Sequence, residues 1–287
     1  MNNKILVIGG TGTTGRELLN ILNKNQVEFK ALVRNSEKAK ELEKSGISTV
    51  KGTLGDWDRI SNVLTDFDTI FLLTGASPEN IDHQNGLIDH ANSVGVKKIV
   101  KISAVVAETG SPVHLADWHG QIEDHLKNSG LEYVILRPHS FMQNMLMSLP
   151  TIKEQDVFYE SIGDGQIPMV DARDVALASY HCLINNNFNN GTYVITGPSS
   201  IGYSDVAKSL SETTNRIINY IKVPSEAHNH GMKAAGLPDW LADDLTQMSK
   251  TWAKSNDKPT DDFKKITGCE PRSIHQFTKD YASYFNS

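Results

Sequence analysis

Seven residues near the N-terminus, Gly-Gly-Thr-Gly-Thr-Thr-Gly at positions 9–15, have the composition of a loop that binds phosphate groups. They follow a β-branched run and lead into a helical pattern, which is the context that a dinucleotide-binding loop requires. Gly9 allows a tight turn, Gly12 lets the backbone approach a pyrophosphate, and Gly15 lets the helix pack against the strand. The helix N-terminus then offers free N–H groups to the phosphates. A glycine-rich turn without a ligand is the alternative. The predicted cofactor-binding residues of this loop are Gly9, Thr11, Gly12, Thr13, Thr14 and Gly15.

The end of the second β-branched run bears on the choice between the two nicotinamide cofactors. In sites that select NAD(H), an acidic side chain at this strand end binds the ribose 2′-hydroxyl. Here the residue is Arg34, followed by Asn35 and Ser36. A guanidinium can bind a 2′-phosphate through paired, charge-assisted hydrogen bonds. We therefore expect NADP(H) rather than NAD(H), and a solvated Arg34 that stacks on adenine is the alternative.

Two more strand ends carry residues suited to a cofactor. Asp56 follows the third run, where adenine-contacting residues commonly lie, and it could also be the N-cap of the next helix. Thr74 and Gly75 end the fourth run, and small residues there let a cofactor pass close to the backbone. We include all three in the predicted cofactor site.

A helical pattern over residues 113–127 carries a titratable side chain on an apolar face. This face should pack towards the sheet and leave His119 near Ser103, at the tip of the fifth run. A histidine titrates near neutrality and could donate a proton or hold a ribose hydroxyl; a packed histidine without a chemical role is the alternative. Trp118 would form an aromatic wall for a flat substrate, or belong to the core. The residues spaced along this face are Leu115, Trp118, His119, Ile122 and Leu126.

The elements that position these residues alternate between β-branched runs and helical patterns, which predicts an α/β fold with a Rossmann-like, doubly wound parallel sheet. The expected strands are Lys4–Ile8, Glu28–Val33, Ser48–Lys51, Thr69–Leu73, Lys98–Ile102 and Tyr133–Leu136. The expected helices between them are Thr14–Asn25, Ser36–Ser45, Trp57–Leu64, Ile81–Ser93 and Val113–Lys127.

After Pro138 the alternation of strands and helices becomes less regular, and we expect a smaller, mainly helical C-terminal cap. The predicted division is a Rossmann domain over residues 1–150 and a substrate-binding portion over 151–287, with strands and helices interleaved with the first domain. Within that portion we expect a strand pair formed by Asp156–Ser161 and Thr192–Thr196, helices at Ala172–Leu183 and Tyr203–Thr214, a strand at Ile217–Val223 and a mostly helical tail.

Composition excludes several classes of function. The 287 residues carry a net charge of −6 without a block of Lys or Arg, which argues against nucleic-acid and anionic-membrane binding. Cys182 and Cys269 lie far apart without His or Cys neighbours, so we expect neither a metal site nor a disulfide framework. No signal-peptide pattern or membrane-length apolar stretch is found, and we expect a cytoplasmic monomer or homodimer.

Three later segments, together with the glycine loop, resemble the NmrA-like branch of the atypical short-chain dehydrogenase/reductases. They are Gly-Leu-Glu-Tyr-Val-Ile-Leu-Arg-Pro at 130–138, Val-Asp-Ala-Arg-Asp-Val-Ala at 170–176 and Tyr-Val-Ile-Thr-Gly-Pro at 193–198. The resemblance spans nearly the whole chain, most firmly residues 4–215. It implies an NAD(P)H-binding protein of a family that includes quinone and dye reductases, isoflavone-type and alkaloid reductases, and NADP(H)-sensing regulators.

This chain also departs from the catalytic pattern of typical short-chain dehydrogenases. Typical short-chain dehydrogenases use a Tyr-x-x-x-Lys pair and a serine; this chain keeps Ser103, but Leu115 takes the tyrosine position and His119 the lysine position. The family pattern places the backbone after Pro138 near the nicotinamide. It puts Phe141, Gln143 and Asn144 on the substrate side. We expect Arg137 to form a structural ion pair with Asp171 or Asp174.

Without a phenol to move the carbinol proton, ordinary alcohol dehydrogenation is disfavoured. A conjugated acceptor such as a quinone, enone or iminium needs less acid catalysis, so the leading hypothesis is a reductase that transfers hydride from NADPH to such a small molecule. The alternative is a non-catalytic NADP(H)-binding regulator of the NmrA type. A sugar-nucleotide epimerase or dehydratase is disfavoured by the missing tyrosine and lysine.

Overall fold

The computed structural model describes residues 4–286, and strands and helices alternate through the first part of the chain. Up to Pro138 the elements are β1 (Ile5–Ile8), α1 (Thr13–Lys24), β2 (Phe29–Val33), α2 (Ser36–Glu43), β3 (Thr49–Lys51), α3 (Trp57–Leu64), β4 (Thr69–Leu72), α4 (Asn80–Val94), β5 (Lys98–Ile102), α5 (His114–Asn128) and β6 (Glu132–Pro138).

The rest of the chain contains more helix than strand. Its elements are the 3-10 helix η1 (Met142–Ser148), α6 (Leu149–Gln155), β7 (Val157–Glu160), α7 (Ala172–Ile184), β8 (Gly191–Ile195), α8 (Tyr203–Thr214), β9 (Asn219–Lys222), α9 (Ser225–Ala234), α10 (Asp239–Trp252), α11 (Asp262–Thr267), α12 (Ile274–Asp280) and α13 (Ala282–Asn286).

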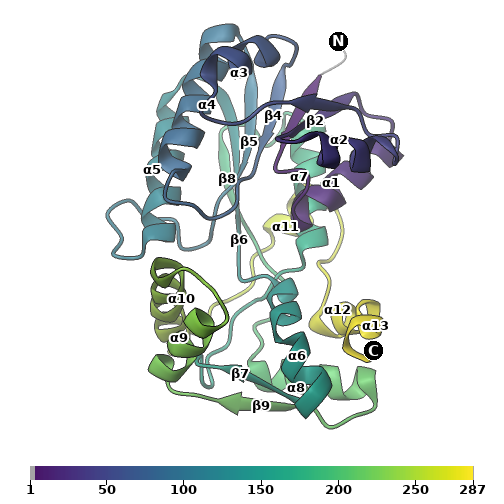
Figure 1. The fold of residues 1–287 in the computed structure, drawn as a ribbon, viewed down its shortest axis with the longest axis vertical. Helices are drawn as coiled ribbons and strands as arrows, with labels where there is room; N and C mark the ends of the chain where they lie inside the picture. Colours follow the sequence, from purple (N-terminus) through teal and green to yellow (C-terminus); the bar gives the residue numbers. More distant parts are fainter. Residues whose placement is uncertain (1–3, 287) are drawn as a thin grey trace. The chain divides into compact units, whose positions relative to one another are not determined.

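The main sheet has seven parallel strands in the order β3-β2-β1-β4-β5-β6-β8. Its central strands are buried on both faces, which explains why β1 and β4 are almost entirely apolar, whereas β5 carries two buried lysines, Lys98 and Lys101. Helices α3, α4 and α5 cover one face, and α1 and α7 cover the other (Figure 1). The predicted Rossmann-like, doubly wound fold is confirmed.

The described chain forms two compact units that are interleaved along the sequence. The first unit contains the described residues up to Pro138 together with Ala172–Ile195 and Asp262–Gly268. The second unit contains His139–Asp171, Thr196–Asp261 and the residues from Cys269 onward. A domain boundary near residue 150, as expected from the sequence, stays a prediction.

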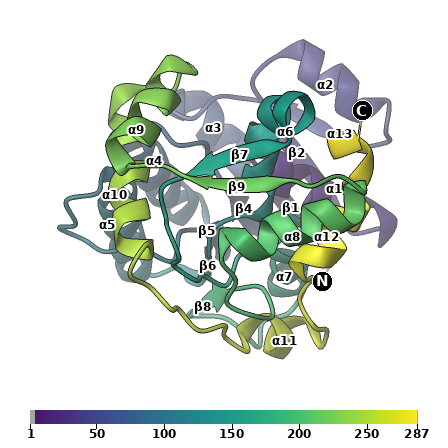
Figure 2. The same cartoon turned by 90° about the horizontal axis from the view of Figure 1, so that it is seen from below.

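One expected strand pairing was wrong. Strand β7 pairs in parallel with β9, while β8 joins the main sheet beside β6 (Figure 2). The sequence pattern instead predicts a pair formed by residues 156–161 and 192–196. An alternating pattern identifies a strand but does not identify its partner, and β8 follows a helix, α7, which is the connection that adds a parallel strand to a sheet.

A buried lysine at the start of β5 fixes the end of α7. Lys98 Nζ donates hydrogen bonds to the carbonyl of Cys182 at 3.0 Å and to Asn186 Oδ1 at 2.9 Å. Burial lowers the pKa of Lys98. Lys98 therefore satisfies acceptors at the C-terminal end of the helix, where carbonyl groups lack partners within the helix.

Candidate functional site

The turn between β1 and α1 needs two of its glycines for the fold itself. Gly9 has φ +85°, and a Cβ there would lie 2.2 Å from the carbonyl oxygen of Leu73. A Cβ on Gly15 would lie 2.1 Å from the carbonyl oxygen of Gly9. These contacts match the tight turn and the close helix–strand packing that the sequence predicts for these two positions.

Gly12 is different, because the fold alone leaves room for a side chain there. It is exposed, and the nearest atom to an added Cβ would be the carbonyl oxygen of Gly9 at 3.6 Å. Gly12 is also the N-cap of α1, and no side chain caps this helix. The positive end of α1 is thus open beside a bare backbone, which fits a pyrophosphate. Of the neighbouring threonines, Thr11 is half-buried, Thr13 exposed and Thr14 buried.

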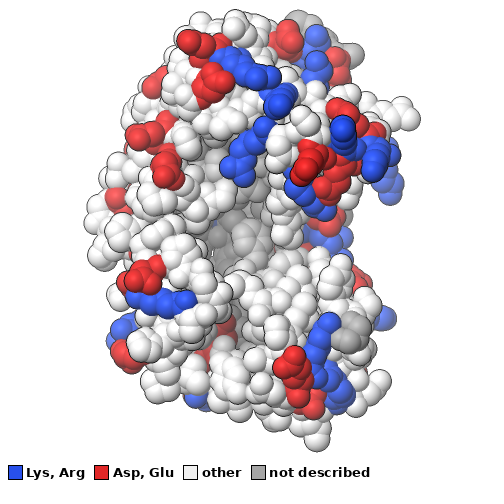
Figure 3. All heavy atoms as spheres, in the orientation of Figure 1, with Lys and Arg blue, Asp and Glu red and all other residues white. Residues whose placement is uncertain are grey.

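Arg34 is exposed and directly follows β2. Within residues 4–286 its guanidinium makes no hydrogen bond or ion pair. By contrast, Arg16 on α1 and Lys38 on α2 are paired: Glu41 accepts from Arg16 at 2.8 Å and from Lys38 at 2.9 Å. Figure 3 shows these opposite charges interspersed over α1 and α2, at the upper right. Arg34 is therefore available to bind an anionic group.

The ends of β3 and β4 carry the other predicted cofactor-binding residues, Asp56, Thr74 and Gly75. Thr74 Oγ1 donates to Asn80 at 2.9 Å and accepts from Gln84 at 2.8 Å, and the Asn80 amide donates to the Gly75 carbonyl at 2.9 Å. A Cβ on Gly75 would meet nothing within 4 Å. Asp56 is the exposed N-cap of α3, but its side chain makes no capping hydrogen bond.

A buried carboxylate lies at the carboxyl end of β5 and β6. Glu123 on α5 is 1% exposed and accepts from Ser103 Oγ at 2.6 Å. Arg137 on β6 donates to both of its oxygens, from Nε at 2.8 Å and from a terminal nitrogen at 2.7 Å. Lys127 adds a contact at 3.2 Å. Burial alone would raise the pKa of Glu123, but the hydrogen bonds from Arg137 and Ser103 outweigh burial and hold its pKa below the usual range.

Beside this carboxylate lies a buried amine that sequence reasoning missed. Lys101 on β5 has no exposed surface, and its Nζ lies 3.1 Å from His119 Nδ1 and donates to the Ile102 carbonyl at 3.2 Å. Burial lowers the pKa of Lys101 to about 7, against an opposing effect of Glu123. The signal in the sequence is alternation: Lys101 shares one strand face with Ser103 and with the core residue Ile99.

The structure corrects two expectations at this site, one for His119 and one for Arg137. His119 contacts Lys101, two residues before Ser103, while Ser103 itself donates to Glu123; the expected nearness of His119 to Ser103 stays a prediction. Burial and the charges of Lys101 and Arg137 lower the pKa of His119 well below 6.5, so titration of His119 near neutrality was a wrong expectation. The ion pair of Arg137 was expected with Asp171 or Asp174, but its partner is Glu123.

The predicted substrate-side residues divide between the two units. In the first unit, Trp118 is half-buried with its ring 5.7 Å from that of His114, and Pro138 is buried at the end of β6. In the second unit, Phe141 is the N-cap residue before η1 and Asn144 is exposed, while the Gln143 amide is buried and donates to Asp171 at 2.8 Å. A substrate role for these residues stays a prediction.

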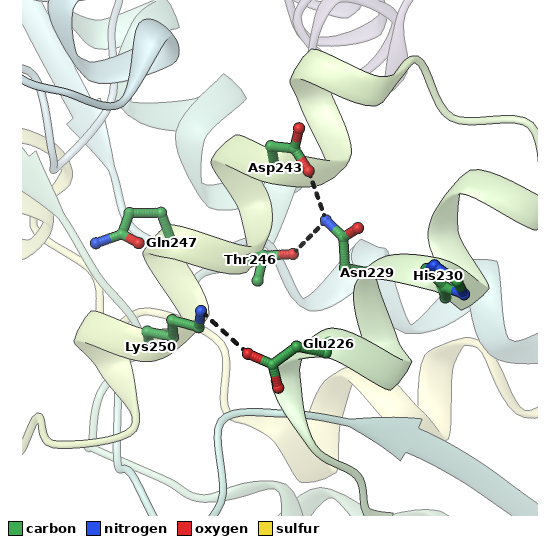
Figure 4. Close-up of a pocket in the computed structure, with 7 residues that line it drawn as sticks. All are labelled: Glu226, Asn229, His230, Asp243, Thr246, Gln247 and Lys250. Atoms are coloured by element: carbon green, nitrogen blue, oxygen red, sulfur yellow. Dashed lines mark hydrogen bonds and ion pairs between the residues drawn. The ribbon is translucent and has the colours of Figure 1, made fainter.

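A separate hollow of about 400 Å³ lies between α9 and α10 (Figure 4). Its side chains are tied to each other: the Asn229 amide donates to Asp243 at 2.8 Å and to Thr246 at 3.0 Å, and Lys250 reaches Glu226 at 3.5 Å. These bonds hold the two helices together, and none of the predicted site residues lies here. Within residues 4–286 no cluster of three metal-binding side chains occurs, and no helix is long and apolar enough to cross a membrane.

Comparison with known proteins places this chain among reductases. The model of the NmrA-like family matches residues 1–284. The NAD(P)H azoreductase of Xenophilus azovorans is 32% identical over 284 residues, which are 99% of each chain. Quinone oxidoreductase 2 of Escherichia coli is 29% identical over 244 residues, covering 84% of this chain and 85% of that protein. The crystal structure of an NADPH-dependent quinone oxidoreductase from Escherichia coli, complexed with NADPH, superposes with a TM-score of 0.87 at 26% identity, covering 99% of this chain and all of that one.

Proposed function

Because this chain belongs to the NmrA-like family, we propose that it is an oxidoreductase that uses NADPH to reduce a conjugated small-molecule acceptor. Its named relatives act as an NAD(P)H azoreductase and a quinone oxidoreductase. Quinones, azo compounds, enones and iminium ions share a conjugated system that accepts hydride, so they form one class of candidate substrates. A cytoplasmic location and a monomeric or homodimeric state stay predictions.

The observation that carries this proposal is the open helix end at Gly12 combined with the unpaired Arg34. The uncapped N-terminus of α1 supplies backbone donors for a pyrophosphate. Arg34 supplies a cation where the ribose 2′-phosphate of NADPH would lie. Gly75 has no side chain and Thr74 is hydrogen-bonded to Asn80, so the cofactor can pass close to the backbone at the end of β4.

When bound, NADPH supplies the hydride, and the protein has to orient the acceptor and provide a proton. The polar groups at the carboxyl end of β5 are suited to the second task. Ser103 and Arg137 are held by Glu123, so they are fixed rather than mobile. His119 keeps one ring nitrogen, Nε2, without a hydrogen bond to any of residues 4–286. We assign the proton-donating role to His119.

The test is NADPH oxidation by the purified protein with an acceptor panel of a benzoquinone, a naphthoquinone, an azo dye and a cyclic enone. Binding of NADPH and NADH is titrated in parallel by fluorescence. We expect turnover with at least one acceptor and tighter binding of NADPH than of NADH. Binding of NADPH without turnover of any acceptor would contradict the enzyme assignment and favour a regulator.

A further inference from the structure

We propose that Lys101 is the source of the proton that accompanies hydride transfer, and that it acts through His119. This inference rests on the proposed function above. Lys101 touches neither cofactor nor acceptor in this scheme, so it is a positioning and proton-supplying residue behind His119.

The geometry gives this pair a defined direction. Lys101 Nζ faces His119 Nδ1 at 3.1 Å, and an ammonium can only donate. His119 Nδ1 is then the acceptor, and the proton of the neutral ring is on Nε2. Nε2 makes no hydrogen bond within residues 4–286 and is not enclosed by other atoms, so a ligand can reach it.

The surroundings of the pair make His119 a poor acid by itself. The groups that act on Lys101 are His119 and Glu123 from α5 and Arg137 from β6. Burial and the charges of Lys101 and Arg137 lower the pKa of His119 well below the usual value for a histidine, so the ring stays neutral. Lys101 in turn has its pKa lowered to about 7, which suits a general acid at neutral pH.

The proposed step balances in atoms and charge. Hydride from NADPH forms a new bond at the acceptor, and the proton on His119 Nε2 moves to the acceptor's oxygen or nitrogen. His119 Nδ1 takes a proton from the Lys101 ammonium at the same time. Lys101 ends as a neutral amine, His119 as its other neutral tautomer, and the cofactor as NADP⁺. A proton from water, returned through Nε2, restores the pair.

The first experiment measures the pair directly in the protein without cofactor or acceptor. Long-range proton–nitrogen NMR spectra of ¹⁵N-histidine protein, with His119 assigned from His119→Gln, are recorded from pH 5.5 to 9. We expect His119 to stay neutral with its proton on Nε2, and both ring nitrogens to shift in one step near pH 7. Lys101→Met should abolish that step. Lys98→Met, which removes a buried lysine from the same strand without a contact to His119, should keep it.

The second experiment follows single-turnover NADPH oxidation over the same pH range. The wild-type rate should fall as pH rises through 7, because Lys101 loses the proton to be donated. In Lys101→Met the rate should be about a hundredfold lower at pH 6 and flat with pH. Lys101→Arg keeps a cation and a donor but does not release a proton, so it should not restore the rate.

These outcomes separate the inference from the proposed function. An imidazolium form of His119 above pH 6, or a step near pH 7 that survives in Lys101→Met, would overturn the role of Lys101. So would turnover by Lys101→Arg at the wild-type rate. If the NMR step is present but the wild type reduces no acceptor, the proposed function fails and the proton transfer falls with it.

Discussion

Arg137 and Glu123 form a two-pronged ion pair between β6 and α5, in which both carboxylate oxygens accept from one guanidinium at 2.8 and 2.7 Å. The carboxylate is 1% exposed and the arginine side chain 25% exposed. Replacing Glu123 by Gln leaves a partly buried cation without its counter-charge. We expect a loss of about 3 kcal/mol in the free energy of unfolding, the lower end for a broken buried pair, measured by urea unfolding at pH 7.

The same substitution has a pH signature. The pKa of Glu123 is lowered in the folded protein, so its stabilising contribution is present above the unfolded value of 4.5 and is lost as pH falls below it. The stability difference between wild type and Glu123→Gln should therefore shrink from pH 6 to pH 3. Glu41→Gln, which breaks an exposed pair with Arg16 and Lys38, is the matched control and should change the free energy of unfolding much less, because water screens exposed ion pairs. A difference for Glu123→Gln that is independent of pH would contradict this reading.

Arg34 should decide between the two cofactors. Loss of a charged hydrogen-bonded contact of about 1.5–3 kcal/mol predicts that Arg34→Ala weakens NADPH binding roughly ten- to a hundredfold, with little change for NADH. Lys24→Ala supplies the control, since it removes an exposed charge from the last turn of α1, at the end opposite the glycine loop. Isothermal titration with both cofactors decides the matter. An equal loss for NADPH and NADH in Arg34→Ala is incompatible with recognition of the 2′-phosphate.

Gly12 and Gly15 should respond oppositely to a side chain. A Cβ on Gly12 has open space, so Gly12→Val should remain folded with a melting temperature near that of the wild type, but lose binding of both cofactors. A Cβ on Gly15 overlaps backbone at 2.1 Å, so Gly15→Ala should lose about 1–3 kcal/mol of stability or more. Circular dichroism melts and fluorescence titrations measure both effects. Retained nucleotide affinity in a folded Gly12→Val would remove the phosphate loop from the site.

Glu160 in the second unit should make stability fall as pH rises. Burial raises the pKa of Glu160 to about 7, against hydrogen bonds from the Ser161 backbone and Tyr203. Since the folded state holds this proton more tightly than the unfolded state, the cost develops between pH 4.5 and 7 and is complete above 7. Glu160→Gln should therefore raise the melting temperature relative to wild type at pH 8 but hardly at pH 4.5. Glu154→Gln, at an exposed position of α6, should show no such trend.

The sequence was a good guide where one local pattern decides the structure. The β-branched runs located β1 to β6 to within about two residues, because strands buried in a parallel sheet read as continuous apolar segments. The glycine turn was recognised because its composition and its place between a strand and a helix are local features, as is the contact of Gly15 with Gly9. Partners far apart in the chain were harder: nothing local distinguishes β9 from β8 as the neighbour of β7.

The same limit explains the errors at the candidate site. The partner of Arg137 was sought among nearby aspartates of the later motif, whereas Glu123 is brought to it by the packing of α5 on β6. Lys101 was read as part of a strand, and its burial depends on the helix that covers it. The expected titration of His119 took no account of Lys101, and burial together with this cation at 3.1 Å lowers the pKa of His119.

The interleaving of the two units has a consequence for biosynthesis. The ribosome delivers β1 to β6 first, but α7 and β8, which complete the same sheet, emerge only after residues 139–171. Until then the nascent chain carries an open β6 edge and a sheet face without α7, and such surfaces favour aggregation. Helix α11, which packs on α7 and β8, arrives later still, at Asp262–Thr267. The first unit therefore finishes folding only when almost all of these residues have been synthesised, and a fragment cut near residue 150 would lack the last strand of its own sheet.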